Sequence, residues 1–407
     1  MGKEDMNDGR TRYAQVGVGG RSWMYTKALV DTYSDRADLV GLCDTNPGRM
    51  DLCNRRISQW HEPVPAYTAD AFDRMIEETR PDTVIVTTVD AAHSRYICRA
   101  MERGCDAITE KPMTTDEEKC RRILRTVADT GRDLRVTFNY RYSPPRSQVR
   151  ELLADGVIGD ITSVDFAWML DTRHGADYFR RWHRLRQNSG SLLVHKATHH
   201  FDLVNWWLDD VPAEVFARGE RRYYRPETAA RMGLDSHSPR CRTCPVSDNC
   251  PFYLDLESRE RLKELYLDCE EQDGYFRDRC VFSPEIDIWD TMGVSVRYAR
   301  GVLMTYMLHA YSPYEGYRIA FNGTRGRLEH HCCENSYISG DDTVPGELTR
   351  GNVTIRLIPA FRAARDIEVR TAKGGHGGGD GPLLADIFDP ERQPSDPLKR
   401  AAGARDG

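Results

Sequence analysis

Short apolar runs alternate with amphipathic segments over the first third of the chain. The apolar runs predict strands at residues 13–18, 38–43, 83–88, 106–109 and 134–138. Helical periodicity between them predicts helices at residues 26–33, 69–78, 93–103 and 116–130. Gly104 and Gly131 follow the last two helices directly, where glycine commonly ends a helix. This alternation predicts an α/β domain with a parallel sheet covered by helices.

The pattern changes after about residue 142, where strands and helices no longer alternate. Helix-like or β-rich segments then occur at residues 148–154, 161–170, 199–208, 291–309 and 317–331. We therefore predict a first domain at residues 1–142 and an α+β domain with a large, mainly antiparallel open sheet at 143–407. The polar segment at about 219–285, rich in Arg and Cys, is interpreted as an insertion into this second domain.

Composition and charge narrow the classes of protein. Hydrophobic residues make up 40% and charged residues 29% of the 407 positions, which is typical of a globular chain. The net charge of −6 is spread along the sequence without a basic stripe, so we expect no nucleic-acid partner. No apolar run approaches the ~20 residues that span a bilayer, and residues 1–12 are polar. We expect a cytoplasmic protein that has no membrane partner.

A glycine-rich turn at residues 17–22 is the strongest local motif, because it lies between the first strand and the first helix. A tight turn needs Gly17, and the close approach of a pyrophosphate needs Gly19 to lack a side chain. Ser22 takes the third small position, where Gly or Ala is usual. The free N–H groups of the following helix suit phosphate oxygens. The candidate cofactor contacts in this turn are Gly17, Gly19, Gly20, Arg21 and Ser22.

An acidic residue at the end of the second strand strengthens this interpretation. Asp44 lies 25 residues after Gly19, where a carboxylate accepts hydrogen bonds from a ribose diol and repels a 2′-phosphate. The pair predicts binding of NAD in preference to NADP, although Arg49 lies close enough in sequence to weaken that preference. The alternative is an ordinary strand-to-helix turn followed by a capping aspartate.

Longer motifs resemble the Gfo/Idh/MocA family of sugar and cyclitol dehydrogenases. The resemblance rests on residues 86–90 with His93, on Glu110-Lys111-Pro112-Met113, on residues 139–144 and on residues 190–202. It covers most of residues 13–209 and, more loosely, the β-rich part after residue 291. It implies a Rossmann domain followed by an α+β domain whose open sheet often forms an oligomer interface, so a homodimer or homotetramer is expected. The implied reaction is hydride transfer between a nicotinamide and a carbon that bears a hydroxyl.

The resemblance also implies roles for individual residues. Lys111 would be the catalytic lysine, His199 would match the family histidine, and Asp202 would support that region. His195 stands where the family commonly has an aspartate, and its pKa near neutrality leaves open whether Lys111, His195 or His199 carries the proton. Arg141 is a candidate for binding the substrate. The implied cofactor contacts outside the glycine turn are Thr87, Thr88, His93, Glu110, Lys111 and Asn139.

Residues 173–184 combine four arginines, two histidines and three aromatic residues. Arginines bind carboxylate or phosphate groups with two hydrogen bonds, and aromatic faces suit the apolar faces of sugar rings. We therefore expect a carbohydrate-like substrate to contact this segment. The alternative is a packed loop with solvated arginines. The candidate substrate contacts are Tyr178, Arg181, Trp182 and His183.

Two further motifs are ambiguous. Cys241, Cys244 and Cys250, with Cys280 as a fourth ligand, have spacings that predict a structural zinc site or, less strongly, an iron–sulfur cluster. The alternative is a set of free or disulfide-paired cysteines. The glycine-rich residues 374–379 either bring His376 towards the active site or form a flexible linker, and Asp380 is expected to cap the helix that follows.

Three functions of different classes fit these motifs. The first is an NAD-dependent oxidoreductase acting on a secondary hydroxyl of a sugar, glycoside or cyclitol. The second is a redox-neutral NAD-dependent glycosidase or lyase that oxidises C3 transiently and then eliminates. The third is a non-enzymatic regulator, which the presence of Lys111 and His199 disfavours. Similar chains often continue with another helix after a segment like residues 401–407.

Overall fold

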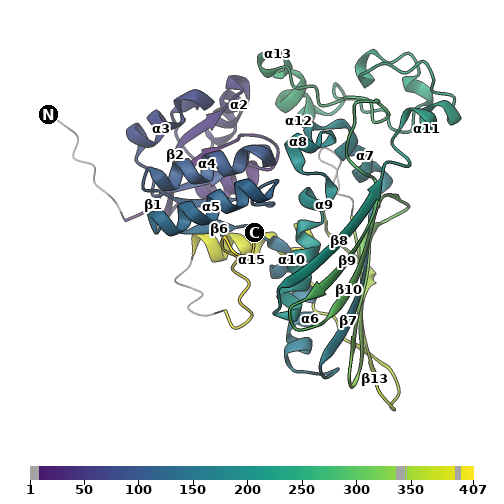
Figure 1. Ribbon diagram of the computed structural model, residues 1–407. Coiled ribbons are helices and arrows are strands. Elements are labelled where there is room, and N and C mark those ends of the chain that lie inside the picture. The colour runs from purple at the N-terminus through teal and green to yellow at the C-terminus, as the bar shows by residue number, and fades with distance from the viewer. Residues whose placement is uncertain (1–8, 336–343, 345, 390–395) are drawn as a thin grey trace.

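The computed structural model describes residues 9–335, 344, 346–389 and 396–407, and Figure 1 shows two sheet-based units side by side. Residues 1–8, which carry part of the predicted polar N-terminus, lie outside the described residues. Among the helices that are described, none is long and apolar enough to cross a bilayer.

The first sheet contains six strands, all parallel, which confirms the predicted parallel sheet and adds the unpredicted strand β3 to the five expected ones. They are β1 (Thr11–Val16), β2 (Ala37–Asp44), β3 (Ala66–Thr68), β4 (Thr83–Val86), β5 (Asp106–Thr109) and β6 (Leu134–Val136). Their order in the sheet is β3-β2-β1-β4-β5-β6. The chain adds β2 and β3 on one side of β1 and then returns to add β4, parallel to β1, on the other side, so the strand order reverses between β1 and β4. Every residue of β4 is buried, because helices cover both faces of the sheet.

The helices of the first unit agree with the periodicity in most places. They are α1 (Trp23–Lys27), α2 (Pro47–Ile57), α3 (Phe72–Thr79), α4 (Asp90–Glu102) and α5 (Glu117–Thr130). Helix α2 was not expected, because few apolar residues mark its buried face. Local chemistry starts it instead: Pro47 occupies the first turn, and the Asn46 side chain accepts a hydrogen bond from the Arg49 N–H at 3.2 Å.

The second sheet confirms the expected open and mainly antiparallel architecture. Its strands are β7 (Ile161–Asp171), β8 (Pro212–Glu220), β9 (Thr291–Tyr298), β10 (Leu303–Ser312), β11 (Glu315–Gly323), β12 (Gly326–Glu334), β13 (Leu348–Pro359) and β14 (Arg365–Ile367). Their order is β14-β13-β12-β11-β7-β10-β9-β8, and only the β7–β10 pair is parallel. The sequence pattern predicts neither β8 nor β13.

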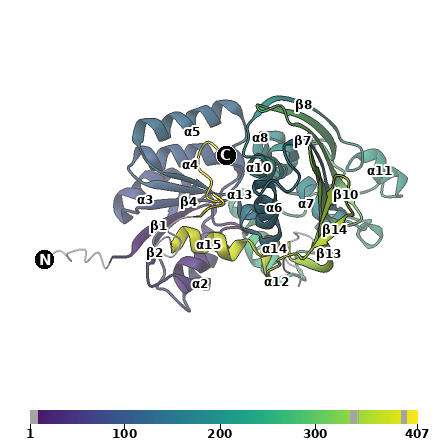
Figure 2. The same cartoon turned by 90° about the horizontal axis from the view of Figure 1, so that it is seen from below.

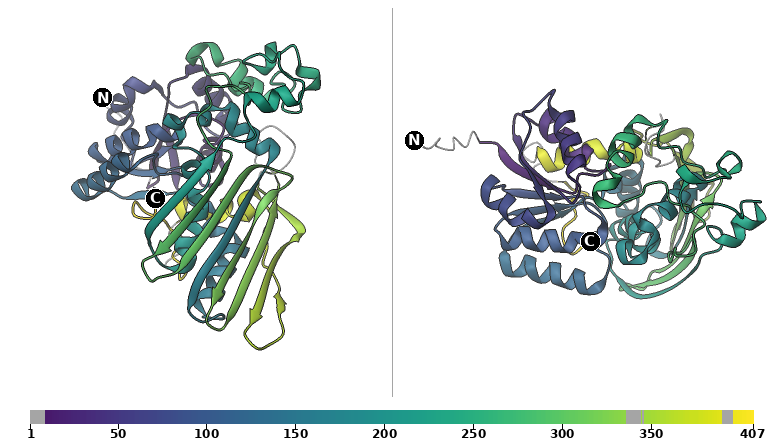
Figure 3. Two further views of the ribbon diagram at one scale, coloured as in Figure 1. Left: turned by 45° about the vertical axis from the view of Figure 1, so that its right-hand side comes forward. Right: turned by 90° about the horizontal axis from the view of Figure 1, so that it is seen from above.

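Helices cover only the inner face of this second sheet. In β7, the alternate residues Val164, Phe166, Trp168 and Leu170 are buried, which is the pattern of a half-covered strand. They pack against α6 (Pro144–Ala154), α7 (Thr172–Arg180) and α10 (Thr198–Leu208). Figure 3 (left) shows the outer face without a covering helix in the part of the chain that the structure describes.

The C-terminal segment returns to the first unit. Helix α14 (Gly375–Gly378) leads into α15 (Asp380–Phe388), which lies beside β1 and β2 in Figure 2. Phe388 contacts the Tyr13 ring edge-on at a centroid distance of 5.2 Å. The prediction that Asp380 caps α15 is wrong, because Gly379 is the N-cap and the Asp380 carboxylate binds other side chains. The prediction of a flexible linker at residues 374–379 is also wrong, because this segment packs closely: a Cβ on Gly377 would lie 2.6 Å from Ser143 Oγ.

The insertion folds against the first unit rather than away from it. Between β8 and β9 it forms α11 (Pro226–Arg231), α12 (Glu260–Leu262) and α13 (Glu270–Asp273), and Figure 1 shows the last two to the right of α2. Leu52 of α2 joins Leu256, Leu265 and Tyr266 in one buried cluster. Asn46 Nδ2 also donates to the Cys269 carbonyl at 2.9 Å.

We expect the buried ion pair between Arg146 and Glu334 to stabilise the second unit. Both side chains are fully buried and contact each other, so Glu334→Ala leaves a buried guanidinium without its counter-charge. The expected loss is about 3–5 kcal/mol of unfolding free energy, measured by denaturant titration with tryptophan fluorescence. Glu117→Ala, which breaks an exposed pair with Arg121, is the control and should cost under about 1 kcal/mol. Equal losses in the two variants would contradict this assignment.

Candidate active site

The glycine turn lies where the strand order reverses between β1 and β4, the usual ligand edge of an open α/β sheet. Gly17 has a φ of +85°, and a Cβ there would lie 2.6 Å from the Thr87 carbonyl carbon, so this position requires glycine. A Cβ on Gly19 would meet nothing within 4 Å, which leaves open space beside the turn. Ser22 Oγ donates to the Gly19 carbonyl at 2.6 Å and closes the turn. This cradle fits a diphosphate.

Asp44 ends β2 at the position expected for a ribose-binding acid. Its carboxylate accepts hydrogen bonds from the Val18 N–H at 2.6 Å and the Asn46 N–H at 2.8 Å, so the backbone fixes its orientation. Arg49 is not free beside it, because Nη1 lies 2.8 Å from an Asp273 carboxylate oxygen. The arginine that weakens the predicted NAD preference is therefore held by the insertion.

Glu110 binds one side chain from the glycine turn and one from α1. Its Oε1 accepts hydrogen bonds from Arg21 Nε at 2.5 Å and from Tyr25 Oη at 2.8 Å. Burial raises the pKa of Glu110, but the charges of Arg21 and Lys111 outweigh it and lower that pKa, so the carboxylate stays ionised. The predicted cofactor contact Arg21 thus points at Glu110 and also lies 3.6 Å from Asp380.

Lys111 reaches across to the second unit from the loop after β5. Its Nζ donates to the His195 carbonyl at 3.2 Å. Burial lowers the pKa of this amine, while Glu110 and Asp90 oppose that shift. His93 supports the loop: Nδ1 lies 2.8 Å from the Pro112 carbonyl and Nε2 lies 3.2 Å from the Thr88 carbonyl. Burial lowers the pKa of His93, so the neutral ring has one N–H to donate to one of these two carbonyls.

Asp90 and His195 form a short contact between the two units. Asp90 Oδ2 lies 2.6 Å from His195 Nδ1, with Asp90 at the start of α4 and His195 at the end of α9 (Leu192–His195). Burial raises the pKa of Asp90, and burial with the Lys111 charge lowers the pKa of His195. The sequence pattern does not single out Asp90, although a polar residue just after a strand at the reversal point is a signal that identifies it.

Three of the predicted substrate contacts gather around His195. The rings of Trp182 and His183 stack at 3.6 Å, and His183 lies 4.2 Å from His195, centroid to centroid. The Tyr178 ring meets both histidines edge-on at 5.1 and 5.4 Å. His183 Nδ1 is buried without a hydrogen-bond partner among the described residues. This surface offers aromatic faces and one unused imidazole nitrogen beside Lys111.

His199 lies on a second side of the same region. Its ring stacks on Tyr140 at 4.3 Å, its Nδ1 is buried without a partner among the described residues, and burial lowers its pKa well below 6.5. Lys196 lies close to His199. A continuous helix would turn its side chain away from His195 and His199, but α9 ends at His195 and α10 begins at Thr198, and the side chain points towards Tyr140. Its Nζ lies 3.5 Å from Tyr140 Oη, and burial lowers its pKa to about 8.

Several predicted contacts are satisfied within the protein. Arg141 Nε donates to both carboxylate oxygens of Asp202, at 3.1 and 2.9 Å, so this buried pair has little capacity left for substrate. Asn139 Nδ2 donates to Asp380 Oδ1 at 2.7 Å, but Asn139 Oδ1 is buried without a partner in the described part of the chain. His376 also binds Asp380, Nδ1 to Oδ2, at 2.8 Å, which brings the glycine-rich segment to this edge.

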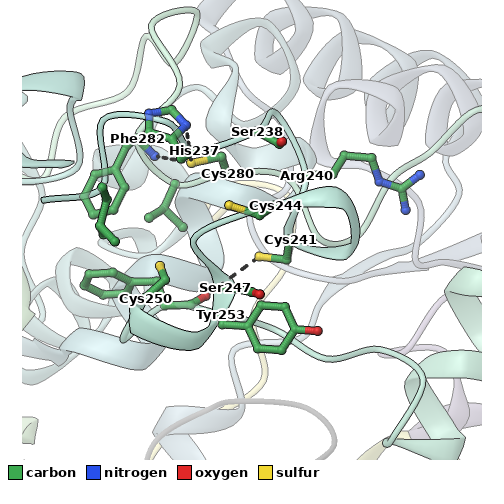
Figure 4. Close-up of a pocket in the computed structure, with 13 residues that line it drawn as sticks. His237, Ser238, Arg240, Cys241, Cys244, Ser247, Cys250, Tyr253, Cys280 and Phe282 are labelled. Atoms are coloured by element: carbon green, nitrogen blue, oxygen red, sulfur yellow. Dashed lines mark hydrogen bonds between the residues drawn. The ribbon is translucent and has the colours of Figure 1, made fainter. Parts of the chain in front are cut away.

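The four predicted metal ligands line one pocket of the insertion, which Figure 4 shows with His237 beside them. All four are free thiols whose sulfurs have different neighbours: Cys280 Sγ accepts from the Phe282 N–H at 3.5 Å, and Cys241 Sγ accepts from Arg180 Nη1 at 3.8 Å. Burial raises the pKa of Cys280 to about 11, which favours the neutral thiol. Among the described residues, no three His, Cys, Asp or Glu side chains are placed to hold a metal, so the zinc and iron–sulfur predictions are not supported.

Comparison with known proteins agrees with this arrangement. Two family models match the chain: the NAD-binding Rossmann fold of the oxidoreductase family over residues 11–138 and the C-terminal alpha/beta domain of the same family over residues 150–347. The Bacillus subtilis (strain 168) protein YteT is 39% identical over 402 residues, which cover 96% of this chain and 91% of YteT.

More distant matches agree in fold. An inositol 2-dehydrogenase of Rhizobium meliloti (strain 1021) is 31% identical over 206 residues, covering 51% of this chain and 57% of that enzyme. The structure of the WlbA dehydrogenase from Bordetella pertussis with NADH and UDP-GlcNAcA superposes with a TM-score of 0.63 at 16% identity, covering 98% of this chain and 92% of that one. The protein is thus an NAD(P)-dependent oxidoreductase that belongs to the Gfo/Idh/MocA family.

Proposed function

We propose that this protein oxidises or reduces a secondary hydroxyl carbon of a sugar, glycoside or cyclitol with NAD. The observation that carries the proposal is the meeting of Lys111, His195 and Asp90 at the ligand edge of the first sheet. A lysine that holds an oxygen and a neutral imidazole that accepts a proton are the two groups that alcohol oxidation needs. The aromatic surface of Trp182 and Tyr178 suits a ring-shaped polyol.

The residues that would hold NAD follow from the geometry of the turn. The N–H groups of residues 19–21 and the open space at Gly19 fit the diphosphate, and Asp44 fits the ribose diol. The negative charge of Asp44 repels a 2′-phosphate, which favours NAD over NADP. The unpartnered Asn139 Oδ1 is an acceptor suited to the carboxamide N–H groups. When bound, the nicotinamide supplies the site that takes or returns the hydride.

The proton is assigned to His195. Its Nδ1 is fixed by Asp90, so the opposite nitrogen has a defined direction and carries no hydrogen bond within the described residues. Because its pKa lies well below 6.5, the imidazole is unprotonated at neutral pH and can accept the hydroxyl proton. Lys111 Nζ donates a hydrogen bond to the same oxygen as negative charge develops on it. His199 is then a contact for the substrate.

A second candidate is a redox-neutral glycosidase or lyase that takes and returns the hydride within one turnover. The position of the insertion favours this candidate. The Tyr266 hydroxyl lies 3.1 Å from the point where a Cβ on Gly20 would be, so this side chain covers part of the glycine turn and would slow the release of a bound cofactor. Incubation with NAD and panels of free sugars, cyclitols and aryl glycosides separates the two. Growth of NADH absorbance supports the dehydrogenase, whereas aglycone release without NADH supports the second candidate.

The expected homodimer or homotetramer remains a prediction. The uncovered face of the second sheet supports it, because Phe216, Leu303 and Met307 expose 60%, 56% and 41% of their surface there. Exposed apolar residues that cluster on one face commonly mark a contact between subunits.

Lys111→Ala should abolish most turnover without loss of the fold. Removing the group that holds the reacting oxygen should lower kcat/KM by about 10²–10⁴-fold while NAD binding persists, as measured by NADH formation and by cofactor titration. Lys27→Ala is the matched control, because the Lys27 side chain is about half exposed at the end of α1, where it pairs with Asp31 and lies over the Trp60 ring. Retention of full activity in Lys111→Ala would contradict the assignment.

Asp90→Asn should lower kcat with little effect on KM. The amide keeps the size of the side chain but removes the negative charge and replaces one carboxylate oxygen with an NH2 donor, so it no longer holds His195 in a single tautomer, and a loss of about 10²-fold or more is expected in single-turnover oxidation. Asp73→Asn on α3, which breaks a partly exposed pair with Arg99, is the control and should keep wild-type kcat. A higher KM at unchanged kcat would assign Asp90 to substrate binding instead.

The pH profile tests the protonation state of His195. A depressed pKa leaves the imidazole unprotonated until the pH falls well below 6.5, so kcat/KM for oxidation should stay level between pH 7.5 and 6.5 and fall only at lower pH. The profile is measured with initial rates in buffers of constant ionic strength. An acid limb with its midpoint at or above pH 6.5 would show that His195 is not the proton acceptor.

A further inference from the structure

Two arginines from separate parts of the chain share one carboxylate beside the reaction site. Arg277, in the insertion, places Nη2 at 2.6 and 2.8 Å from the two oxygens of Asp177 on α7. Arg181, just after α7, places Nη1 3.5 Å from the same carboxylate. The arginine charges outweigh burial and lower the pKa of Asp177 to about 2, so it stays ionised. Arg180 Nε lies 3.8 Å from the same carboxylate, so three guanidinium groups against one carboxylate leave a net positive charge.

The polar groups of this cluster are incompletely satisfied. Arg277 is only 1% exposed, yet its Nε and Nη1 have no hydrogen-bond partner among the described residues. Arg181 Nε and the Tyr275 hydroxyl are also buried atoms without a partner there. A buried donor without an acceptor costs about 1–3 kcal/mol, and more when it is charged. Four such atoms from three neighbouring side chains indicate an acceptor that arrives with a ligand.

The position of the cluster relates it to the substrate. Arg181 directly precedes Trp182 and His183, whose rings stack beside His195. Burial and the charge of Arg181 lower the pKa of His183, which places the guanidinium within electrostatic reach of that ring. Towards the first unit, the Arg277 guanidinium lies 5.6 Å from the centre of the Tyr266 ring, and the Tyr266 hydroxyl lies 3.1 Å from the position of a Cβ on Gly20. The cofactor diphosphate has its own N–H donors at the glycine turn.

We propose that Arg181, Arg277 and Tyr275 form an anion-binding subsite that receives a carboxylate group of the substrate. This rests on the proposed function and narrows its substrate class to sugar acids, such as hexuronates and their glycosides. A planar guanidinium matches a carboxylate with two hydrogen bonds, and two of them converge here. The tyrosine hydroxyl adds one further donor. No proton or electron transfer is assigned to these residues.

The test compares matched pairs of ligands that differ only in the acid group. NAD-loaded protein is titrated with D-galacturonate against D-galactose and with D-glucuronate against D-glucose, by calorimetry, and kcat/KM is measured for each. The wild type should bind at least one hexuronate about tenfold or more tightly than its neutral partner. Arg277→Gln and Arg181→Gln should each remove most of that difference, while affinity for NAD and for the neutral sugar stays within about twofold.

Controls separate the subsite from general damage to the fold. Arg242→Gln, from an exposed pair with Glu257 in the same insertion, should keep the wild-type preference for the acid. Arg277→Lys keeps the charge in the buried position and should retain part of the preference if Arg277→Gln proves unstable. Thermal unfolding of each variant is measured alongside.

Each contrary outcome has a distinct meaning. Equal affinity of the wild type for the acid and neutral sugars overturns the proposal, and turnover of the neutral sugars would then still support the dehydrogenase. Loss of NAD affinity in Arg277→Gln with unchanged discrimination between sugars assigns the arginines to the cofactor and also overturns it. Arginine-dependent binding of a hexuronate without hydride transfer supports the subsite and contradicts the proposed function.

Discussion

The contact between Gly17 and the backbone of Thr87 is the constraint on which the ligand edge depends. A Cβ on Gly17 would lie 2.6 Å from that backbone, so the end of β1 and the end of β4 can meet only through a glycine. With the two strand ends together, the turn before α1 and the first residue of α4 lie on the same edge of the sheet. The cradle for a diphosphate and the carboxylate of Asp90 therefore follow from one close approach.

Burial then sets the chemistry of the groups that gather at this edge. The amine of Lys111 and the imidazole of His195 both have lowered pKa values, because the contact between the two units removes water from them. The ionised Glu110 opposes this effect at Lys111 and holds Arg21 and Tyr25 in fixed directions. The site thus combines the Lys111 amine, which can donate a hydrogen bond to a substrate oxygen, with the His195 imidazole, which is unprotonated at neutral pH and can accept a proton.

The insertion links the two units and brings residues to both cofactor and substrate sides. Its buried cluster with Leu52 places Tyr266 over the glycine turn and Asp273 against Arg49. The cysteine-lined pocket packs beside the loop that carries Arg277, where the Cys241 N–H donates to the Asp278 carbonyl at 2.9 Å. In the described structure these cysteines are partly buried free thiols beside that loop, which carries Arg277 and Tyr275 with their unsatisfied donors.

The sequence by itself determined the α/β class, the parallel sheet, the glycine turn with Asp44, and the loop of Lys111, because each depends on local periodicity or on contiguous motifs. It did not show α2, β3, β8 or β13, which take their places in the fold through contacts with segments far away in the sequence. It also placed His93 and Arg141 among ligand contacts; the structure brings them against the Pro112 carbonyl and Asp202, and their contact with a ligand stays a prediction.

Only the tertiary structure paired Asp90 with His195 across 105 positions and Arg277 with Asp177 across 100. A charge that loses water on folding needs a counter-charge beside it, and no local pattern in the chain encodes which distant residue supplies that counter-charge.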